Sequence, residues 1–144
     1  MAEPVKWRDG VAVVRAAVID AQVHPPSGTG RATVFDFAGT GGERTWIGRV
    51  SLKPNASTGA HHHGRHEVMV YVICGRTEIR WGDGLQFAAE VAVGDLVYFS
   101  PYVPHQERNL SESEAVEFLV VRSDNEKIAV PLDVAVVEHP ELVA

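Results

Sequence analysis

The sequence is poor in cysteine, in positive charge and in long apolar segments. Cys74 is the single cysteine among 144 residues, which excludes an internal disulfide and a zinc site built from cysteines. Lysine and arginine number 13 against 19 acidic residues, a net charge of −6, so neither a nucleic-acid groove nor a polybasic membrane patch is expected. No apolar run approaches the roughly 20 residues that a membrane-spanning helix needs. We expect no nucleic-acid partner and no membrane partner.

The N-terminal residues also lack the pattern of a signal peptide. Residues 1–7 are polar, and the apolar run that begins at Val11 contains Arg15 and has no basic region before it. A cytoplasmic location is therefore expected. The length of 144 residues suits a single domain over 1–144 that buries a core without disulfides.

Short strands separated by glycine and proline turns dominate the pattern, and no internal repeat or convincing helix is visible. This rhythm is typical of an all-β sandwich or barrel. The expected strands cover residues 11–23, 32–37, 45–52, 68–74, 77–81, 85–91, 96–99, 117–122 and 127–132.

Three of these segments and one turn support more specific predictions. Residues 11–23 fit a helix or a strand, and their β-branched content favours a strand. Residues 68–74 are apolar throughout apart from one tyrosine hydroxyl, which predicts a strand buried on both faces. Gly82-Asp83-Gly84 predicts a hairpin between its flanking strands. Residues 127–132 are expected to pair with 117–122 across a polar turn.

Histidine is concentrated at one place in the chain. His61, His62, His63 and His66 are four of the seven histidines, and His105 follows Pro104 in a later segment. In an extended chain His61 and His63 project to the same face while His62 points away. Neutral imidazoles in such a group suit Zn²⁺, Fe²⁺, Ni²⁺, Cu²⁺ or Mn²⁺. We therefore expect one divalent metal ion, bound by histidines from both segments.

The two segments resemble the two sequence motifs of the cupin superfamily. The first motif contains a His-x-His pair, a glutamate and a closing glycine; the second contains a glycine, a histidine and an asparagine. The matching residues in this chain are His61, His63 and Gly75 for the first, and Gly94, His105 and Asn109 for the second. The resemblance implies a double-stranded β-helix, or jelly-roll, barrel whose motif-bearing core covers about residues 45–122.

Two departures from the motifs affect the expected site. Asn55 stands where the first glycine belongs, and asparagine tolerates the left-handed backbone that glycine supplies. Val68 occupies the glutamate position when the spacing is counted back from Gly75, so that His66 shares the inward face with Val68 and Glu67 points the other way. The metal ligands implied by this register are His61, His63, His66 and His105. The alternative set has Glu67 in place of His66.

The run from residue 61 to 72 resembles, in particular, small bacterial cupins that include cyclases of aromatic polyketide biosynthesis. That resemblance implies a zinc-dependent cyclase that polarises a ketone of a polyketide-like, β-ketonic substrate. Glu67 or a metal-bound hydroxide is then the expected catalytic base. The alternatives are a dioxygenase that uses iron, nickel or manganese, and a non-catalytic cupin that binds a ligand or metal. A homodimer is expected, with residues 11–23 covering the partner's sheet edge.

Overall fold

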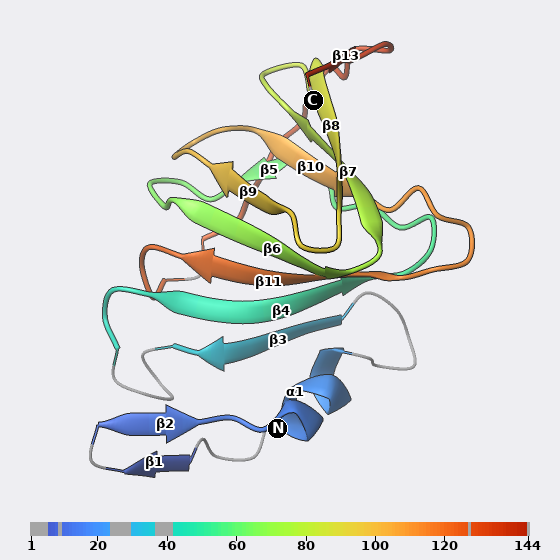
Figure 1. The fold of residues 1–144 in the computed structure, drawn as a ribbon. Helices are drawn as coiled ribbons and strands as arrows, with labels where there is room; N and C mark the ends of the chain where they lie inside the picture. The colour runs from blue at the N-terminus through green and yellow to red at the C-terminus, as the bar shows by residue number, and fades with distance from the viewer. Residues whose placement is uncertain (1–5, 9, 24–29, 37–41, 127, 144) are drawn as a thin grey trace.

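Two sheets face each other and enclose the core of the molecule (Figure 1), and all their strand pairs are antiparallel except the parallel pair of β8 and β13 at one edge. The computed structural model describes residues 6–8, 10–23, 30–36, 42–126 and 128–143. The five-stranded sheet has the order β3 (Gly30–Phe35), β4 (Trp46–Leu52), β11 (Val116–Arg122), β6 (Val68–Cys74) and β9 (Leu96–Phe99). The six-stranded sheet has the order β12 (Val130–Pro131), β5 (His61–His62), β10 (His105–Arg108), β7 (Arg76–Trp81), β8 (Phe87–Ala92) and β13 (Glu141–Leu142). A separate pair joins β1 (Lys6–Arg8) to β2 (Val11–Val13). The predicted all-β jelly-roll fold is confirmed.

The two sheets contribute differently to the interior. Most of the core cluster comes from the five-stranded sheet, through residues such as Val70, Phe118 and Val120. The six-stranded sheet adds Ile79 to that cluster, but its β10 also buries His105 and Glu107. The interior therefore combines an apolar cluster, drawn mainly from the five-stranded sheet, with buried ionisable groups on β10 and at the end of β11, where Arg122 is buried.

Left-handed backbone conformations occur at the turns that the motifs mark. Gly75 has φ +81°, and an added Cβ would lie 2.5 Å from the carbonyl oxygen of Ala115, so the close approach of two strands there requires glycine. Asn55 has φ +63°, as expected for a residue that replaces the motif glycine. In the confirmed hairpin between β7 and β8, Gly82 has φ +104°.

Asn109 closes the loop that precedes β11. The side chain is 2% exposed, and its Nδ2 donates to the carbonyls of Leu52 (3.2 Å), Lys53 (3.0 Å) and Glu114 (2.8 Å). The motif asparagine therefore ties this loop to the end of β4, and it has a structural role.

The segment 11–23 is mostly helical, so the strand predicted there is wrong beyond Val13. Helix α1 (Ala16–Val23) is rich in alanine, the best helix former, and Val23 is its buried residue. It packs against β3 and β4, and Asp20 forms an ion pair with Arg49 of β4 at 2.8 Å. The helix thus lies along the edge of its own sheet, and the homodimer remains a prediction. Within the described residues, no helix has the length and apolar character to span a membrane.

Strand β6 is buried on one face only. Val68, Val70 and Val72 point into the core, but Met69 is 40% and Tyr71 is 42% exposed on the outer face. The prediction of a strand buried on both faces is wrong, because an antiparallel sheet of this kind has one face against the core and one toward solvent.

The last predicted strand pair is also corrected. Strand β12 pairs with β5 of the other sheet, with Val130 opposite His62 and Pro131 opposite His61. Both edges of β11 are already occupied, by β4 and by β6, so no edge is left for it there. Residues 37 and 127, at the ends of two predicted strands, lie outside the described residues.

Candidate metal centre

Three histidine rings meet at one point between the sheets. His61 begins β5 and His105 begins β10, and the two residues are directly opposite in the antiparallel register. His63 follows β5. The ring centroids are 4.3 Å apart for His61 and His105, 4.9 Å for His61 and His63, and 5.1 Å for His63 and His105. One nitrogen from each ring lies within 4.8 Å of the other two, so a single metal ion could contact all three.

A hydrogen bond between Nδ1 and a backbone carbonyl orients each of these rings. A carbonyl oxygen can only accept a hydrogen bond, so a ring nitrogen that bonds to one must carry the proton. Each Nδ1 makes such a bond: His61 to Gly59 at 2.8 Å, His63 to Ile128 at 2.8 Å and His105 to Val103 at 3.0 Å. The Nε2 lone pairs are therefore free, and the Nε2 of His105 is buried without a hydrogen-bond partner. This donor set fits a metal ion, because ligating histidines commonly donate their second ring N–H to a carbonyl.

Burial favours the neutral form of two of these imidazoles, those of His63 and His105. It lowers the pKa of His63 to about 3, although the hydrogen bond to the Ile128 carbonyl opposes the shift. Burial likewise lowers the pKa of His105, against an opposing effect of the Glu107 carboxylate. The ring of Phe99 stacks on the ring of His105 with centroids 3.9 Å apart. Neutral imidazole is the form that binds a metal, so His63 and His105 need lose no proton to bind one at neutral pH.

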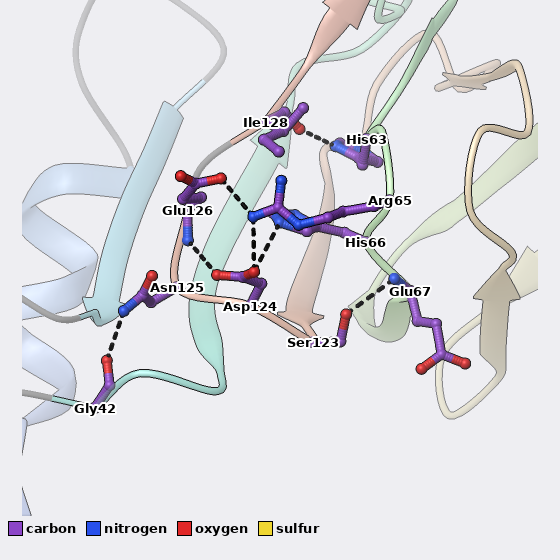
Figure 2. A network of polar contacts seen from close by, with 10 residues as sticks. All are labelled: Gly42, His63, Arg65, His66, Glu67, Ser123, Asp124, Asn125, Glu126 and Ile128. Atoms are coloured by element: carbon purple, nitrogen blue, oxygen red, sulfur yellow. Dashed lines mark hydrogen bonds and ion pairs between the residues drawn. The ribbon is translucent and has the colours of Figure 1, made fainter.

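His66 does not join the other three rings, so the four-histidine set predicted from the sequence is not assembled at one point. Its side chain is 1% exposed and faces inward as expected, but its Nε2 lies 3.9 Å from Asp124 (Figure 2). The backbone N–H of His66 donates to the His63 carbonyl at 3.1 Å, closing a tight turn that carries the ring past the triad. Arg65 bridges Asp124 and Glu126 at 2.9 and 2.6 Å beside it.

Glu67 and His62 both lie outside the triad. Glu67 is exposed, points away from His63 in Figure 2, and accepts a 2.6 Å hydrogen bond from the Tyr98 hydroxyl. The Glu67 carboxylate thus lies apart from the three rings, and its roles as alternative fourth ligand and as catalytic base stay predictions. His62 packs edge-on against Tyr102, and its Nδ1 accepts from the Gly64 N–H at 2.9 Å.

Glu107 is the carboxylate that lies beside the triad. It follows His105 by two residues in β10, so both side chains project to the same face of the strand. One carboxylate oxygen accepts from the Thr58 hydroxyl at 3.0 Å, and the other lies 3.8 Å from the Nε2 of His105. The two-residue spacing is the signal in the sequence, but only the fold places Glu107 in the interior.

Two of the three histidines line cavities that share part of their lining. The inner cavity has a volume of about 30 Å³. Its lining consists of two histidines, two arginines, one threonine, one glutamate and five apolar residues: Arg31, Val50, Thr58, His61, His63, Val68, Val70, Glu107, Phe118, Val120 and Arg122. An outer cavity of about 360 Å³ shares Arg31, Thr58 and His61 with it. A third, mainly apolar cavity of about 380 Å³ is lined by Phe99 and Trp81 among others.

Arg122 is an unusual neighbour for this cavity. It ends β11, is 2% exposed, and stacks on Trp46 with 4.4 Å from its Cζ to the ring centroid. Its Nε and Nη1 are buried without hydrogen-bond partners. Burial lowers the pKa of Arg122 to about 10, and Arg31 adds to the shift, so the group stays charged at neutral pH. A cation–π contact contributes up to about 2 kcal/mol, less than the several kcal/mol that burying an unpaired charge costs.

The fold and the site together place this chain among jelly-roll barrels with a candidate metal centre between their two sheets. The Cupin domain family matches residues 48–122, more than half of the 144-residue chain. The chain belongs to the cupin superfamily, as the sequence motifs implied. A search of curated proteins gives no match.

Solved structures share the fold at low sequence identity. An uncharacterised protein with a double-stranded β-helix domain from Klebsiella pneumoniae has 19% identity and a TM-score of 0.68, over 84% of this chain and 99% of that one. An oxalate oxidase has 18% identity and a TM-score of 0.62, over 75% of this chain and 57% of its own. Oxalate decarboxylase from Bacillus subtilis has 26% identity and a TM-score of 0.63, over 73% of this chain and 28% of its own. The chain thus spans only part of the two enzymes.

Proposed function

We propose that the chain is a metal-dependent enzyme in which His61, His63 and His105 hold one divalent ion. The observation that carries this proposal is the shared hydrogen bonding of the three rings, in which each Nδ1 faces a carbonyl and each Nε2 is left for a ligand. Zinc is the proposed ion, because catalytic zinc sites combine three protein ligands with one open position. Bound there by neutral ligands, it would supply Lewis acidity toward a carbonyl or a water molecule.

We propose that the reaction is the aldol-type cyclisation and dehydration of a β-ketonic, polyketide-like substrate. Such a reaction needs a base for an acidic α-proton. Glu107 is the carboxylate that lines the inner cavity, and the Thr58 hydroxyl orients it. Glu107 therefore takes the role that the sequence suggested for Glu67, whose carboxylate faces Tyr98.

The cavity sizes constrain how such a substrate would bind. The inner cavity of about 30 Å³ admits a carbonyl group but not an aromatic ring system. The outer cavity of about 360 Å³ is large enough for a drug-sized molecule, and His61 and Arg31 border both spaces. The body of the substrate would occupy the outer cavity while its reacting carbonyl extends toward the histidines.

The test combines metal analysis with turnover. Protein purified without added metal is expected to contain zinc, and to convert a linear aromatic β-polyketone to a ring product with loss of water. Glu107→Gln should keep its zinc and lower the rate by about 100-fold or more, whereas Glu67→Gln is the matched control and should retain the wild-type rate. Retention of activity in Glu107→Gln would contradict the role of Glu107, and absence of zinc from His61, His63 and His105 would contradict the metal centre.

A redox-metal dioxygenase is the second candidate, and the position of Glu107 favours it. One oxygen of Glu107 lies 3.8 Å from the Nε2 of His105, so a small shift would give three imidazoles and one carboxylate, a set suited to iron or manganese. Stoichiometric iron, nickel or manganese, with turnover that stops when oxygen is removed, would select this function over the cyclase.

A further inference from the structure

The buried arginines of this protein differ in how their donors are satisfied. Arg80, 6% exposed, donates from Nη2 to the carbonyls of Leu85 at 3.0 Å and Val137 at 2.8 Å. Arg49 forms ion pairs with Asp20 and Glu117. Arg122, at 2% exposed, is the most buried of the three. Its Nε has no hydrogen-bond partner, as is also true of Arg49 and Arg80, but its Nη1 has none either, and no ion pair joins it to a described carboxylate.

The surroundings of Arg122 hold the guanidinium in place without satisfying it. Trp46 lies against the guanidinium group at 4.4 Å and so restricts the orientation of its plane. A π face is not a strong hydrogen-bond acceptor, so the ring of Trp46 leaves the Nε and Nη1 donors of Arg122 unsatisfied. Buried donors without partners are rare in native proteins and call for a ligand or ordered solvent.

The charged side chains around the inner cavity indicate that a ligand of Arg122 would be an anion. The side chains that line it include two guanidinium groups, Arg31 and Arg122, against one carboxylate, Glu107. Glu107 is already engaged by Thr58. A divalent ion on the histidines would make the cavity more positive, so an anion would be strongly favoured there.

We propose that Arg122, held by Trp46, binds the carboxylate of a small organic acid whose neighbouring carbonyl or hydroxyl oxygen faces His61, His63 and His105. The planar fork of the guanidinium matches a carboxylate in a way that no neutral group does. The inner cavity leaves room for the carboxylate end of the molecule, and any larger part extends into the outer cavity. This ligand class, an oxo acid or the corresponding hydroxy acid, rests on the metal-dependent function proposed for the three histidines and adds a carboxylate to what the substrate must carry.

Binding of glycolate tests the inference, with glycolamide as the uncharged match. Ligand-detected NMR titrations would be run on zinc-loaded and metal-free protein. Wild type should bind glycolate and show at least about tenfold weaker binding of glycolamide. Arg122→Met should lose at least about tenfold in glycolate affinity, and Arg122→Lys should fall between the two, because an ammonium group keeps the charge but not the fork.

Arg80→Met is the control for a buried arginine with a structural role. It should lower the melting temperature, because two carbonyls lose their donor, and leave glycolate affinity unchanged. Arg122→Met should keep or raise the melting temperature, because it removes an unpaired buried charge. If Arg122→Met fails to fold, the Arg122→Lys titration decides the question alone.

The outcomes separate this inference from the metal centre. Glycolate bound equally well by wild type, Arg122→Met and Arg122→Lys would overturn the inference. If that binding also required zinc, the proposed function would stand without the anion site. Glycolate binding that depends on Arg122 in a protein whose histidines bind no metal would support the anion site and overturn the proposed function.

Discussion

The ring of Phe99 lies parallel to the ring of His105, with centroids 3.9 Å apart and 19° between the planes. Phe99 ends β9 in the five-stranded sheet, and His105 begins β10 in the six-stranded sheet. The contact therefore joins the two sheets at the candidate metal centre. Together with the hydrogen bond from the His105 Nδ1 to the Val103 carbonyl, it restricts rotation of the imidazole.

Phe99→Leu should weaken metal binding without removing a ligand. The His105 ring would gain rotational freedom, and we expect zinc affinity to fall by about tenfold, as for other groups that orient a metal-binding histidine. The variant should also lose about 1–2 kcal/mol of stability. Competition with a chromogenic chelator would measure the affinity. Val72→Ala, a core change away from the rings, is the control and should cost stability with no change in zinc affinity. Equal zinc affinities in Phe99→Leu and wild type would show that the stack does not position the ring.

Alanine substitutions at His105 and His62 should have opposite effects on zinc content. His105→Ala should leave the protein without bound zinc, because it removes one of three converging nitrogens. His62→Ala should keep zinc near the wild-type content, because the His62 ring packs on Tyr102 outside the triad. Elemental analysis after dialysis against a weak chelator measures both. The assignment fails if the His62 change strips the metal as thoroughly as the His105 change.

His66→Leu tests the fourth ligand that the sequence suggested. Both ring nitrogens of His66 are buried without hydrogen-bond partners, so a leucine of similar size should leave stability unchanged or raise it by up to about 1 kcal/mol. Zinc content should not change. Urea unfolding and elemental analysis are the measurements. Loss of zinc in this variant would restore the set of four histidines.

Stability of the metal-free protein should fall in acid. Burial lowers the pKa of His63 to about 3 in the folded state, against about 6.5 in an unfolded chain. Between these values the unfolded chain binds a proton that the folded protein does not, so stability falls as pH decreases, by about 1.4 kcal/mol per pH unit for this group. Above pH of about 6.5 both states are neutral and the effect vanishes.

Urea unfolding of the metal-free protein at several pH values between these limits provides the test. His63→Asn is the control, since the difference between the two proteins cancels the carboxylates that titrate in the same range. The slope should be shallower in His63→Asn. Identical slopes would mean that His63 takes up a proton in the folded protein as easily as in the unfolded chain.

The fold and the convergence of His61, His63 and His105 could be predicted because their signals are local. The two-residue spacing of His61 and His63 places both rings on one face of an extended segment, and glycine turns such as Gly82 and Gly75 mark where strands end. The helix at Ala16–Val23 was missed because β-branched residues and alanines gave conflicting preferences, and its contact with β3 and β4 decided the outcome.

By itself, the sequence determined that strands would form, that His62 would be turned away from His61 and His63, and that imidazoles from two distant segments would converge. Only the tertiary structure decided how far the side chains of the site lie from one another. The turn between His63 and His66 moved one inward-facing ring away from the others, and the pairing of β5 with β10 set His61 opposite His105. The closing of the two sheets brought Glu107 and Arg122 to the same cavity. Alternation along a strand fixes the direction of each side chain over a few residues. The distances between side chains depend instead on which strands become neighbours, and that follows from the packing of the whole chain.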